Sequence, residues 1–240
     1  MKSYKYLWIL LIILISILLI NTYYVKSNYD YNEPKCILSN MENNEEGCIV
    51  YRNDTIEESD EAVINNYLQN QVGYIKIDGT NINGAIMQYS DNDYYLNHDN
   101  YGNYYVYGSI YMDYRNNVND KKILIFGHNT KGNSISPLHE LEKYESLSFY
   151  QKHPFITMEL NGKKSEWHIF SVLVVSNKSN KHMKLNFTDE GWKNHLDWLK
   201  NNSLYDTNVN VNKDDQIVTI QTCYYGEDET FILVSAKKEK

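Results

Sequence analysis

KILIFGH at residues 122–128 and IVTIQTC at residues 217–223 are the two stretches that decide the expected fold. Each is a short run of mainly β-branched and other apolar residues, which is typical of a buried strand. Six similar segments lie at residues 73–77, 84–88, 107–112, 155–160, 167–175 and 230–236. Asp-Gly at 78–79 and Asn-Gly at 161–162 supply turns between them. About eight short strands with few helices predict a mostly β protein with a closed or nearly closed barrel.

Helices are expected in three places. Residues 136–153 carry an apolar stripe in two short pieces, and residues 56–72 carry apolar residues at helical spacing. Residues 188–204 begin with Thr188, a suitable N-cap, followed by two acidic residues that suit the positive end of a helix. Trp192, Leu196 and Leu199 would form the apolar face of that helix.

The N-terminal residues indicate the compartment. Lys2 and Lys5 precede a predominantly apolar run at residues 6–25, and a run of about 20 residues is long enough to cross a bilayer as a helix. The lysines favour a cytoplasmic N-terminus, and no small-residue cleavage site follows the run, which argues against a cleaved signal peptide. We therefore expect a cytoplasmic tip (1–5), a single-pass signal anchor (6–25), an extracellular stalk (26–55) and a folded domain (56–240).

Charge and composition exclude some functions. The formal net charge is −8 and no Lys/Arg stripe is present, which disfavours nucleic-acid binding. The seven histidines are scattered, with no HExxH motif and no clustered carboxylates. We therefore expect neither a metal site nor another cofactor.

The three cysteines fall into two groups. Cys36 and Cys48 lie in the predicted stalk, where they either close a small disulfide loop or remain two idle thiols. Cys223 is left over, and an unpaired cysteine in an exported protein is a candidate reactive thiol. Both Cys223 and His128 stand at the end of a predicted strand. Neighbouring strands could bring them together as a nucleophile and its base, although a lone Cys–His pair is more often structural or unrelated.

Several motifs in order resemble the sortase family. TIQTC at 219–223 is similar to its TLxTC signature, with Ile220 in place of Leu, and IFGHN at 125–129 is similar to the strand that ends in its catalytic histidine. Residues 91–117 and the predicted helix over 188–204 resemble class B in particular, and the resemblance spans about residues 70–240. It implies an eight-stranded sortase barrel with an N-terminal helix and an extra helix between the sixth and seventh strands.

The resemblance also implies a reaction. A membrane-anchored, extracellular cysteine transpeptidase would use Cys223 to attack the Thr carbonyl of a C-terminal sorting signal on a secreted protein. His128 would protonate the leaving amine and later deprotonate the amine of a peptidoglycan precursor of the lipid II type. The backbone N–H of Tyr224 is a candidate oxyanion donor, and Thr222 and Thr230 are further oxyanion or substrate-binding candidates.

One position departs from the family pattern. The usual arginine, eight residues after the cysteine in close class B relatives, falls on Phe231, and no arginine follows Arg115. Phe cannot replace the charged planar fork of Arg, and loss of an oxyanion donor typically costs about 10²–10³ in rate. The alternative function is therefore a weak or inactive sortase-fold protein that binds sorting signals.

Two other enzyme classes fit less well. A pilus-polymerising sortase is disfavoured by the absence of an N-terminal lid segment and by the class B helix. A papain-like protease is disfavoured because its cysteine precedes its histidine in the chain, whereas His128 precedes Cys223 here.

Overall fold

The computed structural model describes residues 35–38, 48–51 and 70–239, and the chain divides into two compact units, residues 1–59 and 60–240. In the first unit, β1 (Lys35–Leu38) and β2 (Cys48–Tyr51) pair antiparallel, with Cys36 opposite Val50. The side chains of Cys36 and Cys48 are outside the described part, so their disulfide stays a prediction. The predicted tip and anchor, and most of the predicted stalk, also lie outside the described residues. No helix within the described ranges is long and apolar enough to cross a membrane.

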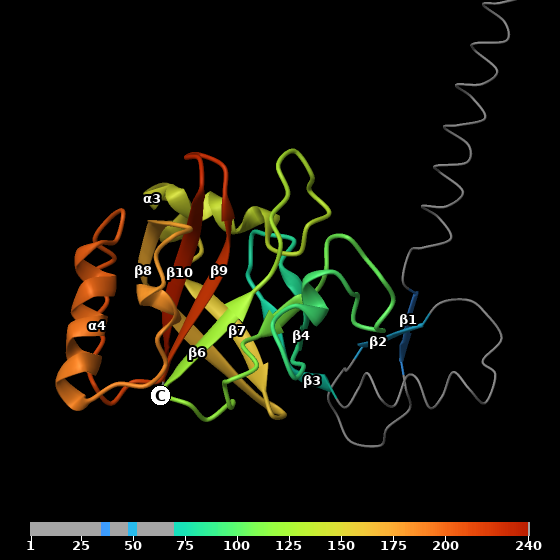
Figure 1. Cartoon of the computed structure of the whole chain (residues 1–240), viewed down its shortest axis with the longest axis horizontal. Coiled ribbons are helices and arrows are strands. Elements are labelled where there is room, and N and C mark those ends of the chain that lie inside the picture. Colours follow the sequence, from blue (N-terminus) through green and yellow to red (C-terminus); the bar gives the residue numbers. More distant parts are fainter. Residues whose placement is uncertain (1–34, 39–47, 52–69, 240) are drawn as a thin grey trace, which may run out of the picture. The chain divides into compact units, whose positions relative to one another are not determined.

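The second unit is built around a closed barrel of eight strands in the order β10-β8-β7-β3-β4-β5-β6-β9 (Figure 1). Most neighbours are antiparallel, whereas β4–β5 and β6–β9 are parallel. The predicted mostly β barrel is confirmed, and each predicted segment contributes one strand. The strands are β3 (Gln71–Lys76), β4 (Asn83–Met87), β5 (Ile110–Met112), β6 (Lys122–Phe126), β7 (Phe155–Leu160), β8 (Lys163–Ser176), β9 (Ile217–Tyr224) and β10 (Thr230–Lys238).

Some predicted boundaries were wrong. The strand predicted at 107–112 begins only at Ile110, because Gly108 adopts a positive φ of 58° and its N–H donates to the Tyr105 carbonyl in a turn. β8 begins at Lys163 instead of residue 167, because the Asn-Gly turn folds it directly onto β7. The helix predicted over 56–72 cannot extend to its expected end, because Gln71 and Val72 already belong to β3. The larger part of that helix lies outside the described residues.

The helices follow the sequence pattern more closely. Residues 136–153 form two short pieces, the 3-10 helix η2 (His139–Glu145) and α3 (Leu147–Lys152). The predicted extra helix is α4 (Asp189–Asn201), which lies between the sixth and seventh barrel strands in sequence. The Gly191 N–H donates to Thr188 Oγ1 at 3.1 Å, and the three predicted apolar residues of α4 are buried. Two further 3-10 turns are η1 (Tyr94–Leu96) and η3 (Lys181–Met183).

Alternation along β10 divides the core into an inner and an outer part. Ile232 and Val234 point into the barrel and join its interior cluster. Phe231 and Leu233 point outward, to a second cluster that includes Leu196 of α4. Figure 1 shows α4 beside the barrel on the side of β8 and β10. Because Cys223 pairs directly with Phe231, the cysteine lies on the outer side of the barrel.

Candidate active site

The pairing of β6, β9 and β10 sets the predicted site residues side by side at one end of the barrel. The pairing of β6 with β9 ends at Phe126 and Gln221, and the same register continued for two residues beyond β6 would set His128 opposite Cys223. On the other side of β9, Cys223 pairs with Phe231 of β10. Side chains two residues apart in a strand share a face. His128, just after β6, Cys223 of β9 and Phe231 of β10 therefore form a row at one end of the barrel, in the order in which they occur in the sequence.

Two hydrogen bonds tie the segments that carry His128 and Cys223. The hydroxyl of Thr222 donates to the Gly127 carbonyl at 2.7 Å, and Nδ2 of Asn129 donates to the Cys223 carbonyl at 2.9 Å. Each bond joins a residue next to His128 with Cys223 or its neighbour. Both donor side chains are almost fully buried, at 2% and 1% exposure, where a satisfied hydrogen bond costs most to lose.

Asn129 is itself held by a second group. Its Oδ1 lies 2.9 Å from Nδ1 of His139 in η2. The amide therefore bridges η2 to the backbone of the cysteine. Our sequence reasoning did not identify Asn129, although its place directly after the predicted histidine was a usable signal.

Gly127 is required by packing. A Cβ at this position would lie 2.8 Å from Cγ of Leu138, and the Leu138 N–H donates to the His128 carbonyl at 3.0 Å. The segment after β6 therefore passes closely under the start of η2, which fixes the backbone that carries His128.

The surroundings of Cys223 keep its thiol neutral. The residue is half-buried, and burial raises its pKa, as does the negative charge of Glu142, while its own backbone N–H opposes the rise. Glu142 is held in place, because its Oε1 accepts the Tyr225 N–H at 2.7 Å. A thiol with a raised pKa is mostly protonated near pH 7 and needs a base to become a nucleophile. A histidine at the level of the cysteine can supply that base.

On the side of β10, the surroundings of Cys223 are apolar. Phe231 packs on the outer cluster, and its ring centroid lies 6.4 Å from that of His182, in an edge-on arrangement. His182 is buried beside Gln221, and among the described residues neither its ring nitrogens nor Oε1 of Gln221 has a partner at good hydrogen-bond geometry, although the two side chains lie close enough to interact. Burial lowers the pKa of His182, while Gln221 raises it. The position at which the family resemblance implies an arginine therefore presents an aromatic ring beside a buried imidazole.

The hydroxyls of the other candidates are occupied. Thr222 donates to Gly127, as described above, and Thr230 Oγ1 donates to the Glu227 carbonyl at 2.8 Å. The Tyr224 hydroxyl donates to Glu145 at 2.7 Å, which is the main reason that the pKa of Tyr224 rises to about 12. The backbone N–H of Tyr224 stays the predicted oxyanion donor.

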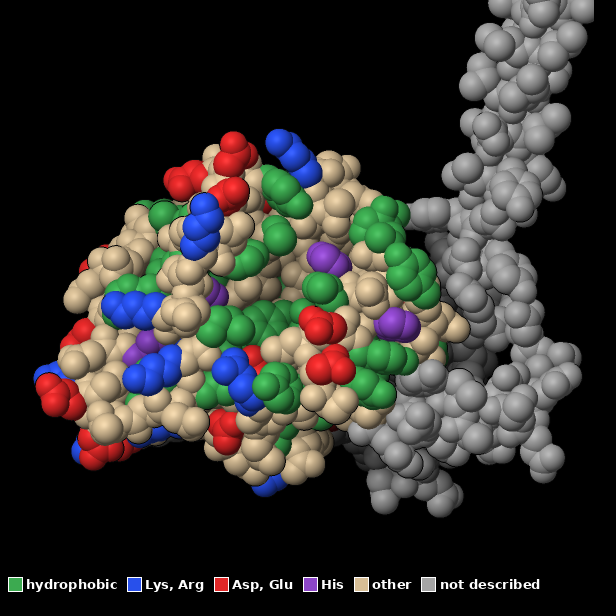
Figure 2. Space-filling model, viewed as in Figure 1, with side chains coloured by type: hydrophobic (Ala, Val, Ile, Leu, Met, Phe, Trp, Pro, Cys, Tyr) green, Lys and Arg blue, Asp and Glu red, His purple; other side chains and the backbone are tan. Residues whose placement is uncertain are grey.

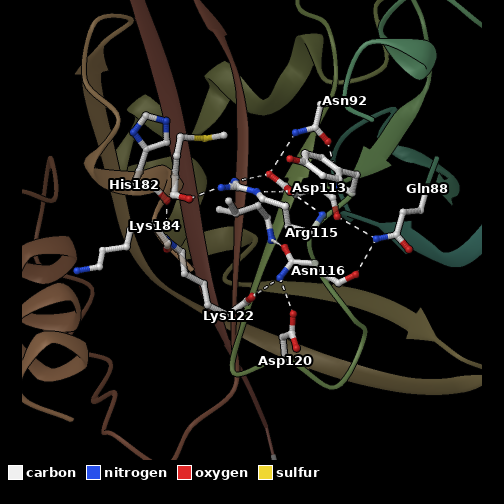
Figure 3. Close-up of polar contacts among 12 residues, drawn as sticks. Gln88, Asn92, Asp113, Arg115, Asn116, Asp120, Lys122, His182 and Lys184 are labelled. Carbon is white, nitrogen blue, oxygen red and sulfur yellow. Dashed lines mark hydrogen bonds and ion pairs between the residues drawn. The ribbon is translucent and has the colours of Figure 1, made fainter. Parts of the chain in front are cut away.

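Arg115 is bound elsewhere (Figure 3). Its Nε and Nη2 donate to the two carboxylate oxygens of Asp113 at 2.8 and 2.7 Å, and Nη2 also donates to the Met183 carbonyl at 3.2 Å. Asp113 is fully buried, and the bonds from Arg115 hold its pKa below the usual value against the effect of burial. Arg115 thus joins the β5–β6 connection to η3, and its hydrogen bonds within the described residues go to Asp113 and Met183 rather than to His128, Cys223 or Phe231.

Comparison with known proteins agrees with this geometry. A sortase domain model matches residues 75–239. Sortase B of Staphylococcus aureus (strain NCTC 8325 / PS 47) is 36% identical over 172 residues, which cover 69% of this chain and 69% of that protein. A Staphylococcus aureus sortase B–substrate complex aligns with a TM-score of 0.67 and 32% identity, over 75% of this chain and 84% of the other. A sortase B complexed with triglycine aligns with a TM-score of 0.67 and 30% identity, over 75% and 85%. The chain belongs to the sortase family of cysteine transpeptidases, and its relatives place it in class B.

Proposed function

We propose that this protein is a membrane-anchored, extracellular sortase that cleaves a C-terminal sorting signal after Thr and transfers the secreted protein to an amine of a peptidoglycan precursor. The observation that carries the proposal is the pair of buried hydrogen bonds, Thr222 to Gly127 and Asn129 to Cys223, which fix the cysteine beside the segment of His128. Catalysis by a positioned pair depends on such fixed geometry.

The acylation step begins at Cys223. Its thiol gives a proton to the imidazole of His128, and the thiolate attacks the Thr carbonyl carbon of the sorting signal. The C–S bond forms as the carbonyl π electrons move to oxygen. When the tetrahedral intermediate collapses, the C–N bond breaks and the imidazolium gives its proton to the leaving amine. The product is a thioacyl-enzyme together with the released end of the signal.

The transfer step reverses these roles. The amine of the acceptor attacks the thioester carbon, and His128 takes the proton that the amine loses. The C–S bond breaks, the new amide leaves, and the thiolate of Cys223 recovers a proton from His128. The backbone N–H of Tyr224 would stabilise the oxyanion in both steps. The reaction needs no cofactor.

The solved relatives support the two kinds of partner. One is a sortase B–substrate complex, and another is sortase B complexed with triglycine, a peptide that carries a free amine. By similarity, we expect a secreted protein with a sorting signal and a lipid II-type amine as the partners of this chain. Attachment to the membrane rests on the apolar run at residues 6–25.

A second function is favoured by one specific observation. Phe231, rather than an arginine, lies directly opposite Cys223. If no other group replaces that charge in the transition state, the protein binds sorting signals with slow turnover or none. The two functions differ in whether a thioester forms on Cys223.

The test uses the full-length chain in a neutral detergent with quenched-fluorescent NPxTx and xPxTG peptides, with and without triglycine as the amine. Mass spectrometry then looks for a peptide adduct on Cys223 and for the triglycine-linked product, and Cys223→Ala is the control. An adduct and a linked product that both vanish in the control establish transpeptidation. Retention of peptide by both proteins without any adduct would favour the binding function instead.

A further inference from the structure

A second site candidate lies along the outer side of the barrel, toward the beginning of β6. A cavity of about 630 Å³ opens there between the β5–β6 connection and the segment that joins β8 to α4. It is lined by Arg115, Asp120, Lys121, Lys122, Lys184, Leu185 and Asn186. Figure 2 shows Lys and Arg side chains gathered beside α4 on the visible face, in a protein whose net charge is −8.

The cavity has more positive than negative charge. Its lining contains four basic side chains and one carboxylate, Asp120, and the charge of Arg115 is matched by Asp113 behind it. Within the part of the chain that the structure describes, Lys121, Lys122 and Lys184 form no ion pair. Three lysines therefore converge on one cavity without carboxylate partners, which favours an anion.

Lys122 differs from the other two lysines because it is buried. It is 2% exposed, and its Nζ donates only to backbone carbonyls, those of His182 at 2.5 Å and Lys184 at 3.0 Å. Burial, together with the charge of Arg115, lowers its pKa to about 7. The negative charge of Asp113 opposes this shift without forming an ion pair with Lys122 in the described part of the chain. A buried amine that lacks an ion pair is costly, and an anion in the adjoining cavity would offset that cost.

Some of the same positive charges also act on a buried histidine. His195 of α4 is buried nearby, and its pKa falls to about 3, first because of burial and then because of positive charges that include Lys122, Lys181 and Lys184. The positive potential therefore extends across the space between β6 and α4. The charges that act on His195 come from two segments of the chain, β6 with Lys122 and residues 181–184.

We propose that this cavity binds a phosphate or pyrophosphate group, carried either by a free ion or by a lipid head group. A multiply charged oxyanion matches several lysines at once, and Arg115, which uses Nε and Nη2 within the described residues, still offers Nη1 as a donor. The same two cations, Arg115 and Lys122, also hold the carbonyls of residues 182–184, and His182 packs against Phe231. A bound anion would therefore contact the segment that supports the apolar side of the Cys223 row.

The test is isothermal titration of the full-length chain in neutral detergent with sodium pyrophosphate and then with sodium phosphate. We expect saturable binding that is weakened at least about tenfold, or about 1.4 kcal/mol, in the double variant Lys121→Gln/Lys184→Gln. Both residues are exposed and bind no carboxylate, so this variant should fold. Lys122→Met should weaken binding further, and the double variant keeps the test valid if Lys122→Met does not fold.

The matched control is Lys76→Gln/Lys178→Gln, which removes the same net charge from two exposed lysines that pair with Asp78 and Glu229. Equal losses in both double variants, or no binding by the wild type, would overturn the proposal. Competition by water-soluble dihexanoyl-phosphatidylglycerol would identify a lipid head group as the ligand, and lack of competition would identify the free ion. No sorting peptide is present, so a negative result would leave the transpeptidase proposal standing.

Discussion

The two flanks of Cys223 are built differently. Toward β6, hydrogen bonds from Thr222 and Asn129 fasten the cysteine to the segment that carries His128. Toward β10, the cysteine faces Phe231, and this ring packs against the buried imidazole of His182. The first flank is polar and hydrogen-bonded, whereas the second is aromatic.

The contrast separates two requirements of thiol catalysis. The first requirement is that the nucleophile lies within reach of its base. The hydrogen bonds on the β6 flank serve this requirement, because they hold the segments of Cys223 and His128 together. Stabilising an oxyanion needs donors or positive charge, and the β10 flank lacks the arginine that the family resemblance leads us to expect there. The contacts that position the cysteine can thus be present in a family member in which the expected arginine is replaced by another residue. The variants below test each requirement, beginning with the largest expected effect.

Loss of the base should have the largest effect. We expect His128→Ala to lower kcat/KM for peptide cleavage about 10²- to 10⁴-fold, because the neutral thiol of Cys223 then has no proton acceptor. His168→Ala, within β8 and beside Glu239, is the matched histidine control and should leave the rate unchanged, because His168 pairs with Lys237, six residues along β10 from Phe231. Wild-type activity in His128→Ala would remove this residue from the proposed mechanism.

Restoring the charge on the β10 flank should raise activity. We expect Phe231→Arg to increase kcat for acylation about 10²- to 10³-fold, the contribution of one oxyanion donor. Phe231→Lys adds charge without the planar fork and should gain clearly less. The measurement is the rate of adduct formation on Cys223 by mass spectrometry. An unchanged or lower rate in Phe231→Arg would show that the aromatic ring belongs to a working site.

Weakening the β6 flank should have an intermediate effect. Asn129→Ala removes the donor to the Cys223 carbonyl, and a small displacement of the cysteine is expected to lower kcat about 10- to 100-fold with little change in KM. Asn133→Ala is the control, because this asparagine lies in the same loop and its side chain accepts only the Ile135 N–H among the described contacts. A larger change in KM than in kcat would mean that Asn129 binds substrate rather than positioning Cys223.

The smallest effect concerns the dependence of stability on pH. Because the folded state lowers the pKa of Lys122 to about 7, the unfolded chain binds more protons between pH 7 and the ordinary lysine value of 10.5. Stability should therefore rise with pH in this window, and the rise should be smaller in Lys122→Met. Urea midpoints at pH 7, 8 and 9 measure the slope. All measurements use the Cys223→Ala background, because the raised pKa of this thiol would reverse the trend as the pH approaches its ordinary value of 9.0.

Local pattern was sufficient to predict the strands, because each buried run of apolar residues is bounded by turn residues. It also predicted α4, since Thr188, the acidic first turn and the apolar face agree with one another. The expectation that His128 and Cys223 lie near each other came from two predicted strands that each end in a candidate site residue.

Contacts between distant segments could not be predicted in the same way. The bond from Asn129 to Cys223 joins residues 94 apart, and nothing local in either segment indicates it. Lys122 resembled an ordinary polar start of a strand, yet carbonyls about 60 residues later enclose its amine. The late start of β5 was missed for a similar reason, because the turn at Gly108 also depends on the Tyr95 carbonyl, which accepts the Ser109 N–H.

The parallel pairing of β6 with β9 has a consequence for how the protein is made. These strands are neighbours in the barrel, but the ties between them span 94 and 95 residues of chain. Contacts of such long range form slowly, since a large loop must close before they are gained. His128 is synthesised 95 residues before Cys223, so a nascent chain that has not reached β9 lacks one member of the proposed pair. Enzymatic competence should therefore appear only at the final stage of folding, when the barrel closes.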